Sequence, residues 1–330
     1  MKLTALNLSP RPMWRYLATV AVLFTAAAGA HAQAASAESQ KLAAEVELAD
    51  VHMHLYKGLT PQDLQSAMDR NRVKWGGGVG PVGPGYDPLD FSRQLGNRYF
   101  PTGGQAEQYE MFVAGGAAEM QDPESPRFKA LLVKLASQFE KKEISGVGEL
   151  ILNNRRSTSY PPNFGRKIPI DASVVQTLFE LVAKHKGFVQ IHMDDDDDSI
   201  QELKKTAANF PSVPIILSHC MTRATAAKAK ALLEQYPNLY CETSFRSTAR
   251  MKIPQLSQFM IHTETSADPG WVVLIEAMPD RFMVGSDIYS SNVSYDEVIA
   301  AVRSGLLARL SPPTLKKVAY ENAQRLFGLQ

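Results

Sequence analysis

Two histidines separated by one residue are the first candidates for chemistry in this sequence. His52 and His54 stand at the end of a β-favouring run that begins at Val46. Side chains two positions apart on a strand point to the same face, so both imidazoles could bring a nitrogen to one cation. Such a pair is a weak signal by itself, because histidines paired on a strand are often only packed or exposed.

Three more residues of suitable chemistry stand at the ends of apolar runs that are typical of buried strands. His192, His219 and Asp287 each close such a run. In a barrel of parallel strands, the carboxyl ends of all strands meet at one rim, so residues far apart in sequence can surround a single ion. The placement of all five residues at strand ends therefore indicates a shared site rather than chance.

These residues suit a metal-dependent reaction. The five residues together could hold a divalent transition metal. Zinc is the first choice, although manganese, iron and cobalt accept the same ligands. A divalent cation lowers the pKa of bound water toward neutrality. Asp287 could then act as general base, and His219 could polarise a substrate carbonyl or stabilise the developing oxyanion.

Two further residues each allow two interpretations. Glu149 could bridge two metal ions, or it could only orient a histidine or pair with Arg155 or Arg156. The number of ions is therefore open between one and two. Arg246 follows another apolar run and could clamp a substrate carboxylate, or it could form an ordinary surface ion pair.

The elements that must position these residues alternate along the chain between β-rich runs and amphipathic helical stretches. This alternation predicts βαβ units with a parallel sheet, and hence the α/β class. The number of strand candidates suits a (β/α)8 TIM barrel. They cover residues 46–54, 73–80, 98–101, 146–152, 188–193, 215–219, 239–244 and 282–287.

Helix signals separate most of these runs. Asp171 could cap one helix, and Ser294 with Glu297 has the spacing of a capping box. Two segments lack such signals: the Gly/Pro-rich stretch 76–88 and the polar stretch 105–127. We interpret both as loops after barrel strands. The Gly/Pro-rich loop insertion would lie on the catalytic face, either as a substrate lid or as a loop without a function.

The N-terminal residues have the pattern of an export signal. A basic stretch precedes an apolar run and a small-residue site, which predicts a Sec-type signal peptide over residues 1–32, cleaved after Ala32. The apolar run is shorter than the roughly 20 residues that a membrane-spanning helix needs. We therefore expect a periplasmic or secreted protein without a membrane partner. Its lead-in would cover residues 33–45 and its barrel domain residues 46–330.

The composition narrows the partners. The chain has 35 basic and 34 acidic residues and a net charge of +1, so it lacks the basic surface of a nucleic-acid-binding protein. A small-molecule substrate is the better expectation, and a homodimer is a general prior. Cys220 and Cys241 are the only cysteines. An exported protein could form one bridge between them, although we favour two buried free thiols.

The ordered motifs of the chain resemble the amidohydrolase superfamily, and within it the amidohydrolase-2 branch that includes aminocarboxymuconate semialdehyde decarboxylase and related lactonases. The resemblance implies that His52, His54, His192 and Asp287 hold the metal, while His219 binds a second metal or assists catalysis. Some relatives, such as the TatD-type nucleases, carry a metal-bridging carboxylate at the place of Glu149. The motifs are DVHMH at 50–54, GEL at 148–150, QIH at 190–192, LSHC at 217–220, GSD at 285–287 and ENAQRLF at 321–327.

Four functions compete on these residues. The leading hypothesis is a metal-dependent hydrolase that cleaves a lactone, ester or amide bond of a small molecule with activated water. The alternative is a metal-dependent, non-oxidative decarboxylase of an unsaturated or aromatic carboxylic acid, although export counts against it. A ligand-binding barrel would usually have lost part of the metal set. Phosphodiester hydrolysis depends on Glu149 alone and lacks the basic surface that nucleic acid demands.

Overall fold

The computed structural model describes residues 35–83, 85–156, 165–252 and 254–330, so the predicted signal peptide lies outside the described residues. Two parallel sheets hold the strands, in the orders β1-β2-β3 and β4-β5-β6-β7-β8-β9. The strands are β1 Leu48–Asp50, β2 Val73–Gly77, β3 Tyr99–Phe100, β4 Gly103–Gly104, β5 Gly146–Ile151, β6 Phe188–His192, β7 Ile215–Leu217, β8 Leu239–Glu242 and β9 Phe282–Met283.

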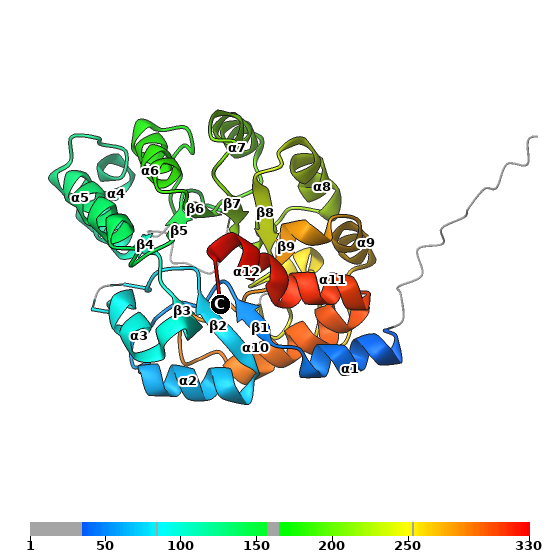
Figure 1. Ribbon diagram of the computed structural model, residues 1–330. Coiled ribbons are helices and arrows are strands. Elements are labelled where there is room, and N and C mark those ends of the chain that lie inside the picture. Colours follow the sequence, from blue (N-terminus) through cyan, green and yellow to red (C-terminus); the bar gives the residue numbers. More distant parts are fainter. Residues whose placement is uncertain (1–34, 84, 157–164, 253) are drawn as a thin grey trace, which may run out of the picture. The chain divides into compact units, whose positions relative to one another are not determined.

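The two sheets together make the predicted (β/α)8 barrel. Only two residues separate β3 from β4, so these short strands occupy one position between β2 and β5. At the other junction, the backbone N–H of Val51 donates to Val284 O at 3.1 Å and that of Asp287 donates to His52 O at 2.8 Å. These bonds connect the segments that follow β1 and β9. Every predicted strand run contains an observed strand, and Figure 1 shows the strands inside a ring of helices.

Helices follow the strands and cover the barrel, as crossovers between parallel strands require. Short π-helical segments continue α10 and α11, at Val302–Leu306 and Lys317–Glu321. The α-helices are α1 Ala37–Glu45, α2 Pro61–Arg70, α3 Pro88–Leu95, α4 Gln105–Glu119, α5 Pro126–Glu140, α6 Ser173–Lys184, α7 Asp197–Asn209, α8 Ala226–Gln235, α9 Pro269–Ala277, α10 Tyr295–Ala301, α11 Pro312–Lys316 and α12 Asn322–Phe327.

The predicted caps have mixed outcomes. Ser294 caps α10, where its hydroxyl accepts a hydrogen bond from the backbone N–H of Glu297. The prediction for Asp171 was wrong, because Ala172 precedes α6 without a side-chain cap and Asp171 instead pairs with Lys205. An acidic side chain near the start of a helix can thus pair with a lysine of the next helix instead of capping its own helix.

The interpretation of residues 105–127 as a loop was also wrong, because most of this stretch is the helix α4. Its buried positions are Gln105, Gln108 and Met111, which share one face at helical spacing. Two of the three are polar, so the apolar periodicity that identifies a helix is missing. Gly116 interrupts the helix with φ 66° and ψ −154°, which weakens the pattern further.

An aromatic cluster closes the end of the barrel at which the strands begin. Phe188 is the first residue of β6, while the candidate ligand His192 is the last. The ring of Phe327 in α12 lies 4.5 Å from that of Phe188 and 5.1 Å from that of Phe100. α12 therefore covers this end of the barrel. The candidate site lies at the opposite end, where the strands finish.

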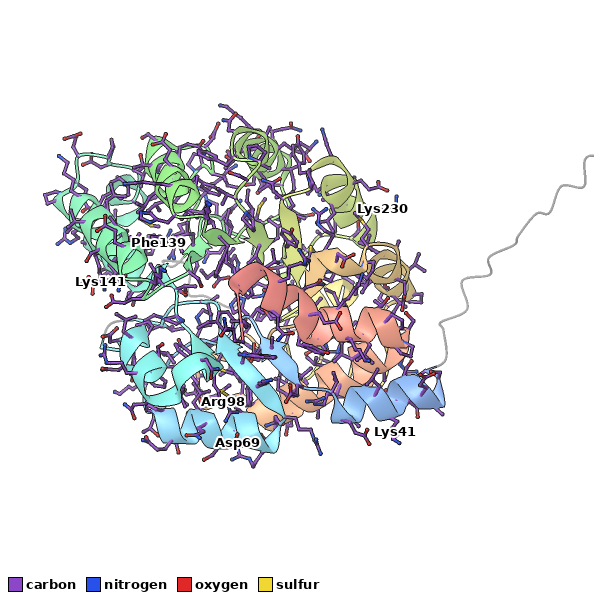
Figure 2. All side chains as sticks on the ribbon, in the orientation of Figure 1. Lys41, Asp69, Arg98, Phe139, Lys141 and Lys230 are labelled. Atoms are coloured by element: carbon purple, nitrogen blue, oxygen red, sulfur yellow. A yellow bond between two sulfur atoms is a disulfide. The ribbon has the colours of Figure 1, made fainter. Side chains whose placement is uncertain are left out.

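The surface and the remaining covalent link complete the fold. Lys41, Lys141 and Lys230 are exposed on the outer helices or directly after them, as Figure 2 shows. Among the described residues, no helix combines the length and apolarity that crossing a bilayer requires.

Cys220 and Cys241 form a disulfide between the ends of β7 and β8, so the interpretation as free thiols was wrong.

Candidate metal centre

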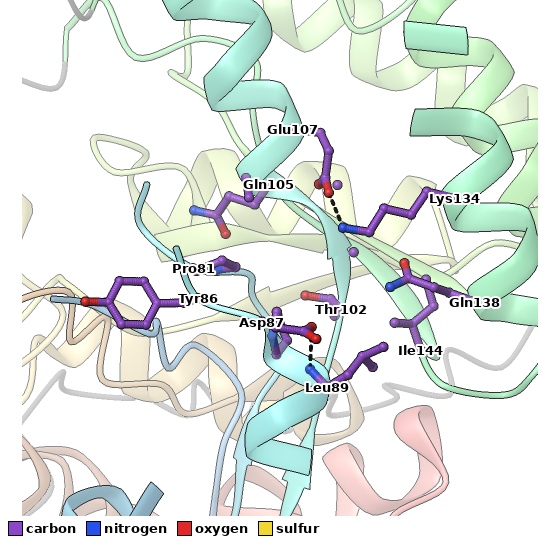
Figure 3. Close-up of a pocket in the computed structure, with 14 residues that line it drawn as sticks. Pro81, Tyr86, Asp87, Leu89, Thr102, Gln105, Glu107, Lys134, Gln138 and Ile144 are labelled. Atoms are coloured by element: carbon purple, nitrogen blue, oxygen red, sulfur yellow. Dashed lines mark hydrogen bonds and ion pairs between the residues drawn. The ribbon is translucent and has the colours of Figure 1, made fainter. Parts of the chain in front are cut away.

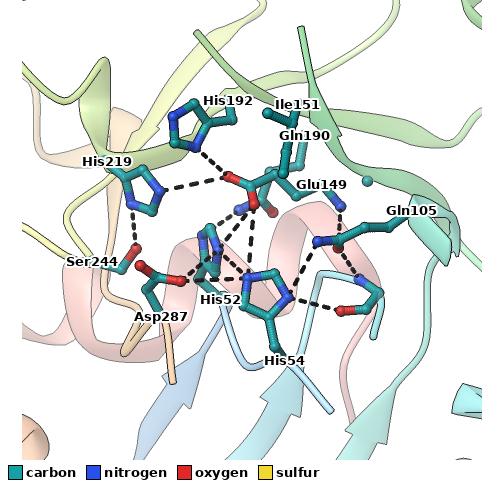
Figure 4. A network of polar contacts seen from close by, with 12 residues as sticks. His52, His54, Gln105, Glu149, Ile151, Gln190, His192, His219, Ser244 and Asp287 are labelled. Carbon is teal, nitrogen blue, oxygen red and sulfur yellow. Dashed lines mark hydrogen bonds and ion pairs between the residues drawn. The ribbon is translucent and has the colours of Figure 1, made fainter. Parts of the chain in front are cut away.

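Six of the seven predicted site residues gather at the carboxyl ends of the strands. Each is at most 6 % exposed. Figure 4 shows their imidazoles and carboxylates pointing toward one another from the ends of several strands. The six are His52, His54, Glu149, His192, His219 and Asp287.

The first group of donor atoms surrounds the pair of histidines after β1. The Nε2 atoms of His52 and His54 lie 3.1 Å apart. Oδ1 of Asp287 lies 3.5 Å from the first and 3.4 Å from the second. Oε2 of Glu149 lies 3.6 Å and 3.7 Å from the same two nitrogens. Four ligands around a tetrahedral metal with bonds of 2.0–2.1 Å are separated by about 3.3 Å, so this donor set fits a divalent cation.

The second group of donor atoms uses the other oxygen of the same glutamate. Oε1 of Glu149 lies 3.2 Å from Nδ1 of His192 and 3.5 Å from Nε2 of His219. The three candidate ligand atoms, one from each residue, lie within 4.8 Å of one another. Glu149 thus faces both groups, one oxygen to each, as a bridging carboxylate would. His192, which we grouped with His52, His54 and Asp287, lies with Glu149 and His219.

Electrostatics in this centre favour a cation. Burial alone would raise the pKa of Glu149, but His52 and the hydrogen bonds with His192 and His219 hold it well below its usual range. Burial would lower the pKa of His52, but Glu149 and Glu242 raise it well above its usual range. The same carboxylates that increase the affinity of His52 for a proton would attract a divalent cation.

Asp287 has a basic partner that the sequence did not indicate to us. Nη2 of Arg250 lies 3.1 Å from Oδ2 of Asp287, and both side chains are buried. Burial would raise the pKa of Asp287, but Arg250 and a hydrogen bond with His54 hold it below its usual range. Arg250 lies eight residues beyond β8, outside any strand, so a search of strand ends does not find it.

Glu242 is the second residue that the prediction missed. It is the last residue of β8, fully buried, and its Oε1 lies 2.9 Å from Nδ1 of His52. The strand-end pattern that selected His192 and Asp287 also applies to Glu242. We overlooked it because the predicted run continued to Ser244.

Arg246 contacts the cluster at a backbone atom, since its Nη1 lies 3.4 Å from the backbone oxygen of His219. Its guanidinium donates to the backbone oxygens of Phe259 at 2.7 Å and Ala224 at 2.8 Å, and it packs over the ring of Trp271. Burial lowers its pKa to about 9. These contacts join the loops after β7 and β8, and the contact with a substrate carboxylate stays a prediction that this geometry does not favour.

The Gly/Pro-rich segment contacts the centre at Gly80. Gly80 O accepts a hydrogen bond from Nδ1 of His54 at 2.8 Å, and Gly80 N donates to Oε1 of Gln105 at 2.8 Å. Farther along, Pro81, residues 86–89 and Gln105 border a cavity of about 90 Å³, which Figure 3 shows with the Glu107–Lys134 ion pair at its edge. A water molecule occupies roughly 30 Å³ of liquid volume, so this cavity holds a few waters and no substrate. The role as a lid stays a prediction.

A larger pocket of about 500 Å³ lies between the loops after β8 and β9. Two of its lining residues contact the centre: Arg250 pairs with Asp287, and the ring of Phe245 lies 5.2 Å from that of His219. Tyr289 also lines it. Small-molecule sites usually have volumes of roughly 300–1,000 Å³ and apolar walls, so this pocket has the size for a small substrate.

Comparison with known proteins agrees with this architecture. The model of a family described as amidohydrolase matches residues 49–329. An amidohydrolase from Burkholderia multivorans is similar in structure, with a TM-score of 0.56 and 15 % identity over 86 % of this chain and 100 % of that chain. A candidate 2-pyrone-4,6-dicarboxylic acid hydrolase from Pseudomonas putida has a TM-score of 0.56 and 16 % identity over 86 % and 98 %.

A 2,6-dihydroxybenzoate decarboxylase complexed with 2,6-dihydroxybenzoate is also similar, with a TM-score of 0.51 and 12 % identity over 86 % of this chain and 99 % of that chain. At these identities the likeness establishes the fold alone. No curated protein matches the chain.

Proposed function

The chain belongs to the amidohydrolase family, and from this premise we propose that it is a metal-dependent hydrolase of a small molecule with a lactone, ester or amide bond. The observation that carries the proposal is the Glu149 carboxylate, which faces His52 and His54 with one oxygen and His192 and His219 with the other. We infer one cation beside His52, His54 and Asp287, and a second beside His192 and His219. Zinc is our first choice.

A divalent cation held there would polarise the carbonyl of the substrate and lower the pKa of an attacking water. The ligands have distinct tasks. Asp287 stays ionised beside Arg250 and supplies a negative charge to the first donor group. Burial lowers the pKa of His219, so its ring is neutral near pH 7. Its Nε2 then has a lone pair that can accept a proton or bind the second cation.

The substrate is a small molecule in this proposal. The walls of the pocket of about 500 Å³ include Phe245, Arg250 and Tyr289. Arg250 pairs with Asp287, and the ring of Phe245 lies 5.2 Å from that of His219. A substrate bound at the centre could therefore extend its apolar part into this pocket. The leader predicted over residues 1–32 supports export to the periplasm or medium, which we propose as the location.

Decarboxylation is the second candidate. Structures that share this fold include both the candidate 2-pyrone-4,6-dicarboxylic acid hydrolase and the 2,6-dihydroxybenzoate decarboxylase. A centre of histidines and carboxylates suits either reaction. We favour hydrolysis because esters and lactones are more accessible to an exported enzyme than the intermediates of intracellular catabolism are.

The test measures two products at once. The full-length chain, reconstituted with Zn²⁺ or Mn²⁺, is assayed for acid release and carbon dioxide release on lactones, esters, amides, and unsaturated and aromatic carboxylic acids. We expect acid release that His54→Ala abolishes and that His185→Ala, outside the centre, leaves intact. Carbon dioxide without a hydrolysis product would establish the second candidate instead. Bound ligand without turnover would favour a binding protein.

A further inference from the structure

We propose that Glu242 and Ser244 are positioning residues that determine which ring nitrogen of His52 and of His219 carries the proton. Both stand at the end of β8, and both are at most 2 % exposed. The inference deepens the proposed function, since it concerns how the histidines of the same centre present their nitrogens to a cation.

The carboxylate of Glu242 can only accept hydrogen bonds in this position. Its Oε1 accepts from the backbone N–H of His219 at 2.6 Å, and its Oε2 accepts from the backbone N–H of Ser244 at 2.7 Å. Backbone N–H groups are donors without an alternative role. Each oxygen therefore faces a definite donor, and Glu242 has no proton to offer to a histidine.

This arrangement determines the tautomer of His52. Its Nδ1 lies 2.9 Å from Oε1 of Glu242, so Nδ1 must carry the hydrogen that this contact needs. In a neutral ring the other nitrogen, Nε2, then has the lone pair. That atom is the one that faces His54, Glu149 and Asp287.

The same reasoning extends to His219 through Ser244. The hydroxyl of Ser244 lies 3.0 Å from Oε1 of Glu242 and donates to it. Its oxygen then accepts from Nδ1 of His219 at 2.9 Å, so that nitrogen also carries the hydrogen. Nε2 of His219 has the lone pair and faces Glu149 at 3.5 Å.

His54 independently adopts the same tautomer. Its Nδ1 lies 2.8 Å from the carbonyl oxygen of Gly80, which can only accept, so Nε2 of His54 has the lone pair. With both rings neutral, the Nε2 atoms of His52 and His54 therefore direct two lone pairs toward each other across 3.1 Å. Neither can donate to the other. A cation that both nitrogens bind would turn this repulsion into attraction.

Within the described part of the chain, Gln190 makes the competing contact at His52. Its amide nitrogen lies 3.1 Å from Nδ1 of His52 and could donate only if Nδ1 had a lone pair. That lone pair would lie 2.9 Å from an oxygen of Glu242 that cannot donate, so the two atoms would repel each other. The amide turned over by 180° presents its oxygen to the N–H instead, which is compatible with the tautomer that Glu242 imposes.

The packing leaves room for Glu242 at this place because residue 285 is a glycine. A Cβ on Gly285 would lie 2.9 Å from Oε2 of Glu242, 2.7 Å from Cβ of His52 and 3.0 Å from Cβ of Ser244. Gly285 thus admits all three side chains. One carboxylate thereby connects a histidine of the first donor group with a histidine of the second.

The first experiment measures metal affinity. The full chain is stripped of metal and titrated with Co²⁺ and Zn²⁺ as wild type, Glu242→Gln and Ser244→Ala. Removing the partner of a metal-binding histidine usually costs 10–100-fold in affinity, and we expect roughly that loss for Glu242→Gln. Ser244→Ala should weaken only the cation beside His219. Glu276→Gln, a carboxylate on α9 that accepts from Ser311 and Thr314, is the matched control and should bind as wild type does.

The second experiment needs no metal. Long-range ¹H–¹⁵N spectra of the metal-free chain with ¹⁵N-labelled histidine report the protonated ring nitrogen of each neutral imidazole. At alkaline pH, where both rings are neutral, we expect the Nδ1–H form for His52 and His219 in the wild type. Ser244→Ala should lose it for His219 alone, whereas Glu242→Gln should lose it for both. Glu242→Asp, which keeps a carboxylate, should restore part of the effect.

Two outcomes would overturn the inference: unchanged tautomers in both variants, or metal affinity within twofold of wild type for a folded Glu242→Gln chain. If Glu242→Gln does not fold, Ser244→Ala decides, since it removes only a hydroxyl. A wild-type chain that binds no divalent cation would overturn the proposed function instead, and the tautomer spectra would still decide the positioning role.

Discussion

Arg250 holds Asp287 at two points, so that only one carboxylate oxygen faces the histidines. Nε of Arg250 donates to the backbone oxygen of Asp287 at 2.7 Å, and Nη2 donates to Oδ2 at 3.1 Å. Oδ1 faces Nε2 of His52 and of His54. The guanidinium lies over the rings of Phe245 and Tyr289, which keeps it in place. Arg250 therefore both neutralises Asp287 and orients it.

Arg250→Met should impair stability and activity together. Removing one partner of a buried ion pair usually costs about 3–5 kcal/mol, because the other charge remains buried without a counterion. We expect a loss of this size in the free energy of unfolding, measured with urea, and at least a tenfold loss in kcat/KM. Arg93→Met, at an exposed ion pair, should change neither quantity measurably. Wild-type stability in Arg250→Met would refute this role for the ion pair.

The bridging position of Glu149 predicts how many ions each variant retains. Elemental analysis of the reconstituted wild type should find two divalent ions per chain. His192→Ala should lose one ion and keep the one beside His52, whereas Glu149→Ala should weaken both, since both donor groups share this carboxylate. His185→Ala serves as the control. One ion in the wild type, unaffected by His192→Ala, would contradict the two-ion arrangement.

The sequence predicted the parts of the fold that depend on periodic burial. Parallel strands buried on both faces appear as continuous apolar runs, so β6 and β7 were recognisable from residue types alone. The candidate ligands at their ends followed from the geometry of a barrel rim. α4 was missed because its buried face carries Gln105 and Gln108. From the sequence alone, a glutamine on the buried face of a helix cannot be distinguished from a glutamine in a loop.

The division of the candidate ligands into two groups could not be predicted, for a different reason. Which histidines share an ion depends on rotamers and on the carboxylate that lies between them, and no local pattern encodes either. His192 faces Glu149 with its Nδ1, whereas His52 and His54 face it with their Nε2 atoms. Arg250 was missed because it reaches Asp287 from a loop, where sequence spacing carries no information about contacts.

We expect the disulfide to stabilise the loop that carries His219. His219, Cys220 and Met221 all have positive φ, between 50° and 60°, which is costly for residues other than glycine. The bridge closes a separation of 21 residues, for which chain entropy gives a stabilisation of about 3 kcal/mol. Cys220→Ser with Cys241→Ser should lose roughly this amount in urea unfolding.

The same double variant should also lose activity below its unfolding transition, because the strained loop can relax and move the ring of His219. Reduction of the wild type with a thiol should reproduce both effects and leave the double variant unchanged. An equal kcat/KM for the folded double variant and the wild type would show that the bridge serves stability alone.

His262 should make the stability of the protein depend on pH between about 4 and 6.5. Its ring is 2 % exposed, and burial lowers its pKa from 6.5 to about 4, against the opposing effects of Thr263 and Glu264. In this window the unfolded chain binds a proton at His262 that the folded chain does not. The free energy of unfolding therefore falls as the pH falls from 6.5 toward 4, by on the order of 3 kcal/mol from this residue.

His262→Asn tests this contribution directly. The asparagine amide can replace the Nδ1 donor, which lies 3.0 Å from the carbonyl oxygen of Thr263, but it does not titrate. Urea unfolding at several pH values should give a smaller slope of free energy against pH for the variant than for the wild type, with convergence above pH 7 apart from a constant offset. His185→Asn should retain the wild-type slope. Parallel curves for His262→Asn and the wild type would mean that His262 takes up its proton without unfolding, and that its burial does not oppose the charge.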